Sequence, residues 1–189
     1  MIVLITPPSV EPVTLLQAKL HLKLITNPAD ASVHPDDAKV QDLISVAREQ
    51  AEQFCNRAFA EAGYEARGCG FDVALFGPAG AITSVKYLDT DGAEQTLANT
   101  VYELNASLDR LRLKIGQSWP AVYARDDAVR VVFSAGDDPA DVPRSVWAAM
   151  LLIVGTLYDN RASLDDRQTF ALPLRVQDLL MPYRVGMGV

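Results

Sequence analysis

The sequence predicts an α+β fold with a mainly helical core and an antiparallel β insertion near residues 72–134. Segments at both ends of the chain show helical periodicity, and the middle third is rich in β-branched and aromatic residues. Glycine-rich breaks separate the two kinds of pattern. At 189 residues and 49% hydrophobic content, the chain is long and apolar enough to bury a core. We expect a single domain over 1–189, with the β-rich part inserted into it.

Four helices are predicted, near residues 14–24, 38–60, 141–161 and 174–181. The first starts at the N-cap candidate Thr14 and carries an apolar face. The second repeats apolar residues at helical spacing, and its charged residues point largely outward. The last follows Pro173 and ends at Pro182.

The 141–161 segment organises the helical part of this prediction. Asp141 is its N-cap candidate, and Arg161 places a positive charge at its carbonyl end. Between Val146 and Tyr158 the only polar side chain is Thr156, so we expect neighbours on every side of the helix. The apolar run is shorter than the about 20 residues that a membrane span needs. We therefore interpret it as a buried central helix.

The middle third predicts a meander of short antiparallel strands. Its hairpin loop is Asp89-Thr-Asp-Gly92, between strands at Ile82–Leu88 and Glu94–Leu97. Further strands are expected at 101–104, 111–115 and 128–134. Gly63, Gly68 and Gly70 are interpreted as the break before this β-rich part.

Composition excludes several classes of function. The net charge of −7, the pI near 4.8 and the absence of a basic run argue against a protein that wraps nucleic acid. The first residues do not resemble a signal peptide, so we expect the protein to be made in the cytosol. Cys55 and Cys69 are too few for a disulfide framework.

No enzyme motif is complete. Gly63 and Gly68 have phosphate-loop spacing, but Cys69 follows where lysine is required. Asp89 begins a pattern similar to a calcium-binding loop, but Thr100 stands where that loop requires glutamate. Neither His21 nor His34 has a second histidine at metal-ligand spacing. Four acidic pairs could serve a two-metal site but are better explained as loop residues: Asp36-Asp37, Asp126-Asp127, Asp137-Asp138 and Asp165-Asp166. We predict no catalytic residue, cofactor or metal.

The order of several short segments resembles the phage head-tail connector (adaptor) family of tailed phages and prophages. The first half contributes Glu11-Pro-Val-Thr-Leu15, Asp42-Leu-Ile44 and Val85-Lys-Tyr-Leu-Asp89. The second half contributes Trp119-Pro120, Val129–Phe133 with Gly136, Val142-Pro143, Tyr158-Asp-Asn-Arg161 and Pro182-Tyr-Arg184. The long loop at 26–37 and the glycine-rich 63–70 depart from the pattern.

This resemblance implies a structural virion protein that forms a ring of identical subunits, often twelvefold, between portal and tail. DNA would pass through its channel without specific binding, no membrane would be involved, and assembly would take place in the host cytoplasm. Trp119, Tyr183 and Arg184 are the candidate interface residues, because aromatic residues and arginine are enriched at interfaces. Two alternatives stay open: a monomeric protein-binding module, and a small enzyme that uses loop carboxylates.

Overall fold

The computed structural model describes residues 1–29, 32–105, 107–159 and 172–185. In chain order the elements are β1 (Ile2–Thr6), α1 (Leu15–His21), α2 (Asp37–Cys55), β2 (Ala62–Gly68), β3 (Ala79–Leu88), β4 (Glu94–Thr96), β5 (Tyr102–Asn105), β6 (Arg110–Leu113), β7 (Val129–Ala135), α3 (Arg144–Asp159), α4 (Leu174–Leu180) and a 3-10 turn η1 (Met181–Tyr183). They form two compact units, one from residues 1–9 and 60–137 and the other from the described parts of 10–59 and 138–189.

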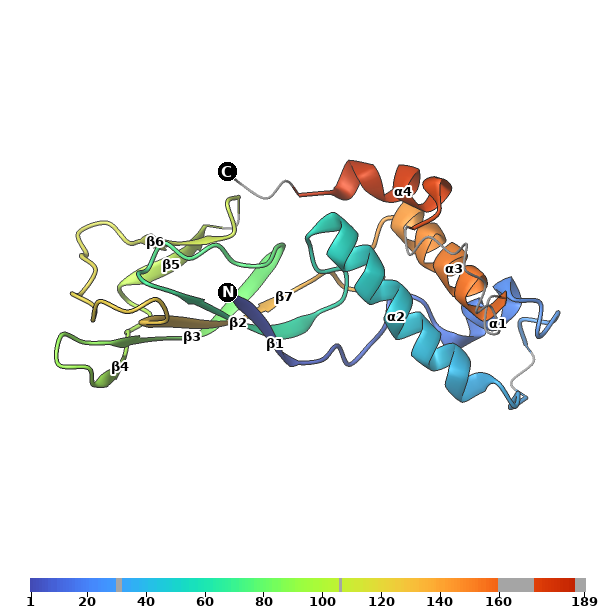
Figure 1. The fold of residues 1–189 in the computed structure, drawn as a ribbon, viewed down its shortest axis with the longest axis horizontal. Coiled ribbons are helices and arrows are strands. Elements are labelled where there is room, and N and C mark those ends of the chain that lie inside the picture. The colour runs from blue at the N-terminus through green and yellow to red at the C-terminus, as the bar shows by residue number, and fades with distance from the viewer. Residues whose placement is uncertain (30–31, 106, 160–171, 186–189) are drawn as a thin grey trace, which may run out of the picture. The chain divides into compact units, whose positions relative to one another are not determined.

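The first unit, here the sheet unit, is built on a five-stranded antiparallel sheet with the order β1-β2-β7-β3-β4 (Figure 1). The strand β7 returns from late in the sequence and lies between β2 and β3. A separate hairpin pairs β5 with β6. Where the chain leaves β7, Gly136 has φ +118, and a Cβ there would lie 2.1 Å from the carbonyl oxygen of Ala60. Only glycine fits this close approach.

The two faces of this sheet differ in chemistry. In β7 the residues alternate between buried and half-buried, as expected for a strand with one face on the core. Val129, Val131 and Phe133 are buried, and the paired residues Ala66 and Tyr64 of β2 extend the same apolar face. Other buried residues of this unit include Phe71, Val73, Leu75, Val85, Leu97, Tyr102 and Leu111. The opposite face carries charged residues.

The prediction of a mainly helical core with β structure confined to about 72–134 was wrong. Two strands of the sheet, β1 and β2, come from outside that range, and the predicted simple meander is interrupted by β7. The glycines misled the prediction, since Gly63 and Gly68 lie within β2. A Cβ at Gly63 would lie 3.0 Å from the Thr6 side chain, so this glycine allows β1 to approach closely.

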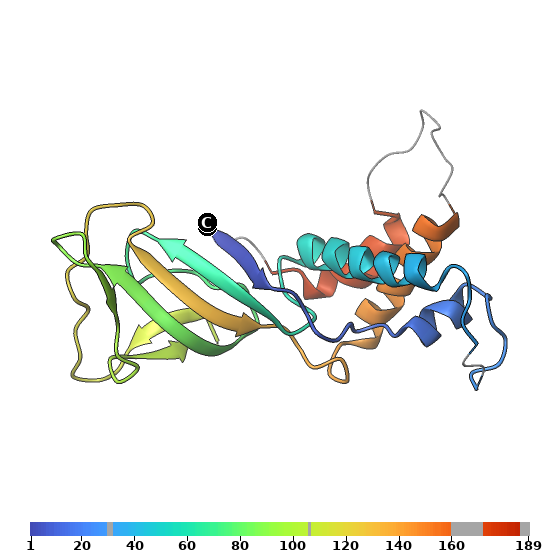
Figure 2. The same cartoon turned by 90° about the horizontal axis from the view of Figure 1, so that it is seen from below.

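The second unit, here the helical unit, buries one apolar cluster among α1, α2, α3 and α4. Figure 2 shows α2 alongside α3 and α4. The central members come from two helices, Val40, Ile44, Ala47 and Ala51 from α2 and Val146, Met150, Ile153 and Val154 from α3. All eight side chains are at most 2% exposed. The heptad-like spacing of these residues explains why both segments form helices that pack together.

The predicted helices all appear, with shifted ends. Thr14 caps α1 as predicted: its hydroxyl accepts a hydrogen bond from the Gln17 backbone N–H, and the Gln17 side chain accepts one from the Thr14 N–H. The predicted cap Asp141 is wrong, because α3 begins at Arg144 and the Asp141 N–H bonds the Asp138 carbonyl in a turn. Residues 160 and 161 of the predicted helix lie outside the described residues. The predicted single connector-like domain stays a prediction.

Candidate interaction surfaces

Within the described residues, no group of three or more His, Cys, Asp and Glu side chains could hold a metal ion. The described helices include none with the length and apolar character of a membrane span. The acidic pairs serve local structure where they are described. The Asp138 carboxylate accepts the N–H of Ala140, and Asp127 pairs with Arg125. Asp165-Asp166 lies outside the described residues.

The two cysteines differ sharply in accessibility. Cys55 is buried with its thiol 3.5 Å from the Leu180 carbonyl oxygen, whereas Cys69 is exposed. Burial raises the pKa of the Cys55 thiol to about 11, so almost none of it is thiolate at neutral pH.

We therefore expect a thiol reagent such as DTNB to modify Cys69 rapidly in the folded protein and Cys55 only after unfolding. Absorbance with and without urea measures both reactions. The variant Cys69→Ser is the control and should show no rapid phase. Two rapid phases in the native protein would contradict the buried position of Cys55.

A polar cluster fixes the start of α2. The ammonium of Lys19, itself buried, lies 2.9 Å from Asp37 Oδ1 and donates to the Ser32 carbonyl at 2.8 Å. The His34 backbone N–H donates to Asp37 Oδ2 at 2.9 Å. The pKa of Asp37 is lowered, chiefly by this hydrogen bond and secondly by the one from Lys19. The cluster thus joins α1, the loop at 32–36 and α2.

Because the folded pKa of Asp37 is depressed, its contribution to stability is present above the ordinary carboxyl pKa of about 4 and is lost as pH falls through the folded pKa. We expect Asp37→Asn to lower Tm at pH 7, with the gap from wild type closing as the pH falls below about 4. Thermal melts across pH test this. Asp42→Asn, an exposed change on the same helix, should shift Tm by no more than about 2 °C. A Tm difference between Asp37→Asn and wild type that persists in acid would contradict the stabilising role of the Asp37 carboxylate.

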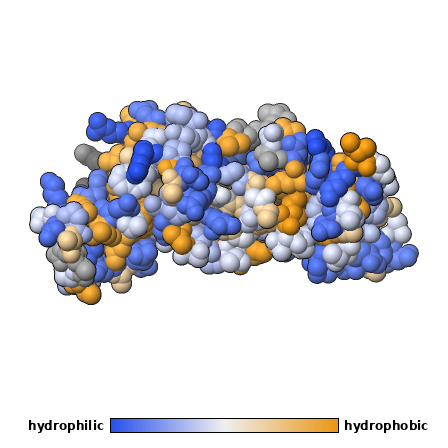
Figure 3. Space-filling view, turned by 180° about the vertical axis from the view of Figure 1, so that it is seen from behind, coloured by the Kyte–Doolittle hydropathy of each residue, from blue (hydrophilic) through white to orange (hydrophobic). Residues whose placement is uncertain are grey.

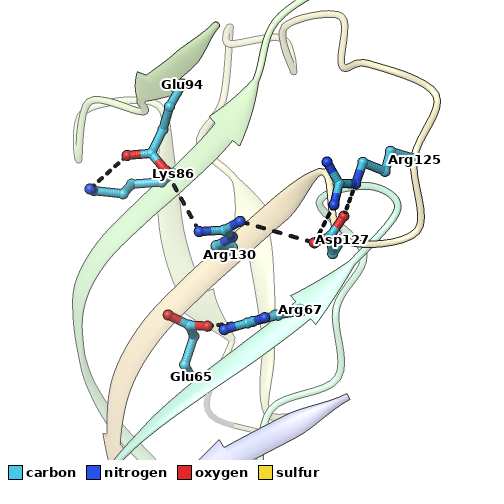
Figure 4. Close-up of polar contacts among 7 residues, drawn as sticks. All are labelled: Glu65, Arg67, Lys86, Glu94, Arg125, Asp127 and Arg130. Atoms are coloured by element: carbon cyan, nitrogen blue, oxygen red, sulfur yellow. Dashed lines mark hydrogen bonds and ion pairs between the residues drawn. The ribbon is translucent and has the colours of Figure 1, made fainter. Parts of the chain in front are cut away.

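The outer face of the sheet carries a row of three cations. Arg67 of β2 lies opposite Arg130 of β7, which lies opposite Lys86 of β3. Like charges directly opposite one another destabilise a sheet. Each of these cations is therefore accompanied by a carboxylate, and Figure 4 shows the resulting contacts.

The carboxylates come from β2, from β4 and from the loop before β7. Glu65 pairs with Arg67, and Glu94 lies 2.8 Å from the Lys86 ammonium and 3.8 Å from the Arg130 guanidinium. Asp127 lies 4.0 Å from Arg130 and also pairs with Arg125 (Figure 4). The four basic and three acidic groups nearly balance, and all are partly exposed. This face is a mixed-charge surface suited to a polar protein contact, not a phosphate-binding patch.

The predicted interface residue Trp119 belongs to the sheet unit and is half-buried. Its ring stacks on Phe71, with the centroids 4.5 Å apart and the planes 7° apart. Phe71 in turn meets the Tyr87 ring edge-on at 5.6 Å. Trp119 therefore has a local packing role, and its use in an interface stays a prediction.

The other two predicted interface residues belong to the helical unit. The hydroxyls of Tyr183 and Ser145 are 2.9 Å apart, and Tyr183 is half-buried. Arg184 is exposed, with its guanidinium 5.5 Å from the centre of the Phe54 ring. These two residues and Trp119 belong to different units. Arg184 is the most accessible of the three.

An apolar groove along α3 was not predicted. It has a volume of about 560 Å³ and is lined by Gln17, Leu20, His21, Trp147, Ala148, Leu151, Leu152 and Arg175. Trp147 and Leu152 are only half-buried. The expectation that α3 has neighbours on every side was therefore wrong. On the face of the molecule seen in Figure 3, hydrophobic surface forms several separate areas among hydrophilic ones.

Sequence reasoning also missed β1. Its signal was present, because Ile2-Val-Leu-Ile-Thr6 is an uncharged run rich in β-branched residues, which is typical of a strand. The opposed charges on the sheet could not be found in the same way. Their register depends on β2 and β7, which are far apart in the sequence.

Together the fold and its surfaces define a class: an α+β protein with an antiparallel sheet unit and a helical unit, in whose described residues no group of three or more His, Cys, Asp and Glu side chains could hold a metal ion. Neither the protein-family models nor the curated proteins gave a match. The comparison with solved structures did give matches. A chain in "Neck of empty GTA particle computed with C6 symmetry" matches with a TM-score of 0.77 and 20% identity, over 100% of this chain and 97% of that chain.

Two further structures agree. A chain in "Virion of native gene transfer agent (GTA) particle" matches with a TM-score of 0.75 at 20% identity, over 100% of this chain and 97% of that one. A chain in "Neck of native GTA particle computed with C12 symmetry" has a TM-score of 0.60 at 20% identity, with coverages of 85% and 96%. At this identity the likeness establishes a shared fold along nearly the whole of each chain.

Proposed function

We propose that this protein is a structural neck component of a phage or phage-like particle, a head-tail connector that forms a ring between portal and tail. The whole-chain fold match to chains of gene transfer agent structures carries the proposal. Two of those structures are described as necks computed with sixfold and twelvefold symmetry, which favours a ring of identical subunits. The order of short segments in the sequence independently resembles connector proteins.

The charges are compatible with this role. The chain carries a net charge of −7, and the cations of the outer sheet face are balanced by Glu65, Glu94 and Asp127. Such a surface does not offer the unpaired cations that retain DNA. A channel built from this chain would let DNA pass without specific binding. The proposal includes no catalysis, and it places the mature protein in the virion after assembly in the host cytoplasm.

The test mixes the purified protein with the portal ring of the same phage or prophage and measures the product by mass photometry and electron microscopy. We expect a closed ring bound to the portal, whose added mass is a whole multiple of the 20.6 kDa chain. A ring requires each subunit to present two different surfaces to its neighbours. A chain that stays monomeric and unbound at high concentration with the portal present would overturn the connector proposal.

The apolar groove along α3 favours a second candidate, a monomeric module that binds an apolar segment of another protein. Its volume of about 560 Å³ lies within the range of binding pockets, and Arg175 and His21 are among its lining residues. The same mass measurement separates the candidates, because a module of this kind binds without forming a ring. Leu152→Glu, in the groove wall, should then abolish binding, and thermal melting checks that the variant folds, since Leu152 also packs against the core cluster.

A further inference from the structure

The two edges of the five-stranded sheet are built differently. The edge strand β4 is three residues long, and its Glu94 is paired with Lys86. Short length and charge are the usual protections of an edge strand. The other edge strand, β1, is five residues long, carries no charged side chain and exposes all its residues. Ile2, Val3, Leu4 and Ile5 are between 36% and 48% exposed. The pairing of β1 with β2 is regular over residues 2–4 and shifts between Leu4 and Thr6, so residues 2–4 are the regular, uncharged part of the edge that can pair with another strand.

The register shows which backbone groups of β1 are open. The Met1 amino group donates to the Arg67 carbonyl at 3.0 Å, and the Arg67 N–H donates to the Met1 carbonyl at 2.8 Å. In an antiparallel pair such doubly bonded positions alternate with positions whose groups point the other way. Ile2 lies opposite Ala66 and Leu4 opposite Tyr64, so the N–H and C=O of Ile2 and Leu4 point away from β2. In the described part of the chain, no strand pairs with that side of β1.

The net charge of the chain restricts where two copies can touch. Copies of a chain with a net charge of −7 repel one another, so their closest contact belongs where neither copy places a carboxylate. The side chains of β1 meet that condition, and they offer apolar contact on both faces of the strand. Backbone pairing supplies the affinity in such a contact, and the alternating side chains supply the specificity.

We infer that β1 is an assembly edge, to which an extended segment of a second copy of this chain adds as a further strand. The contact is heterologous, because the partner segment is not the partner's β1, and it therefore propagates around a ring. The inference rests on the proposed ring function and assigns one of the two surfaces that each subunit needs. The outward N–H groups of Ile2 and Leu4 are the donors that the neighbouring copy satisfies.

The test compares variants of one exposed β1 residue with matched controls. Leu4→Pro removes an outward N–H without taking a hydrogen bond from β2, and Leu4→Lys places a charge on the edge. Ile115→Pro and Ile115→Lys are the controls, since Ile115 is fully exposed in the same unit and precedes Gly116 in a turn where proline is accepted. Thermal melting confirms that each variant folds.

Two readouts are made on wild type and variants, with and without the portal ring: ring formation by mass photometry, and hydrogen exchange of the peptide that contains β1. We expect exchange in β1 to slow when wild-type rings form, both Leu4 variants to lose ring formation, and both Ile115 variants to keep it. Rings that form from the Leu4 variants, or in which β1 exchanges as in the monomer, overturn the inference and leave the ring function intact.

Two other outcomes also count against it. Slow exchange in β1 of a single copy bound to the portal would show that another protein occupies the edge. Slow exchange in a dimer joined through both β1 strands would show an isologous contact. Absence of any ring from wild type, with the portal present, overturns the proposed function and this inference together.

Discussion

Met150→Asp will abolish the folded helical unit. The Met150 side chain is 1% exposed and lies in the cluster that joins α3 to α2 and α4. An aspartate there would place a carboxylate inside this apolar cluster, and burying an unpaired charge costs several kcal/mol or more. A chain of this size has a net stability of about 5–15 kcal/mol, and loss of the core packing adds about 2–5 kcal/mol.

Circular dichroism and thermal melting measure this effect, with Thr156→Asp as the control. Thr156 lies on the same helix and is exposed, with its hydroxyl donating to the Leu152 carbonyl at 2.8 Å. That change should cost no more than about 1 kcal/mol. A Met150→Asp protein that melts cooperatively near the wild-type temperature would show that α3 is not the centre of the core.

Arg48→Ala is expected to lower the free energy of unfolding by about 3–5 kcal/mol. Arg48 of α2 is 4% exposed, and its guanidinium lies 2.9 Å from Glu11 and 2.6 Å from Glu52. Glu52 also accepts the Phe59 backbone N–H at 2.8 Å, so the network ties the segment before α1 and the segment after α2 to the middle of the helix. Removal of the arginine leaves both carboxylates without this buried cation.

Urea unfolding gives the size of the loss, and two further variants test its cause. Glu49→Ala removes a third carboxylate, 3.5 Å from the same guanidinium but 56% exposed, and should cost less than about 1 kcal/mol. The double variant Arg48→Met with Glu52→Gln should recover part of the loss, because the amide oxygen can still accept the Phe59 N–H. An Arg48→Ala cost below about 1 kcal/mol would mean that solvent reaches the network.

Local patterns placed the helices correctly and placed the sheet only in part. The capping box at Thr14 and the apolar periodicity of residues 40–55 depend on neighbours within about four residues, so they are visible in the sequence. The pairing of β1 with β2 and of β2 with β7 is not visible in this way, because the paired residues are at least 57 positions apart. Strand propensity also depends strongly on tertiary context, and the glycines of β2 hid a strand that its neighbours stabilise.

The candidate surfaces divide in the same way. The sequence alone determined the acidic balance of the chain, the absence of complete enzyme motifs, the helical segments and the hairpin at Asp89, whose carboxylate accepts the N–H groups of Asp91 and Ala93. Those features follow from composition or from residues close together in the chain. Tertiary structure decided that Trp119 stacks on Phe71, that three cations align across β2, β7 and β3, and that β1 forms an open, uncharged edge. Register and burial create these features, and both arise only when distant segments pack, because a strand has no open edge until its sheet is formed.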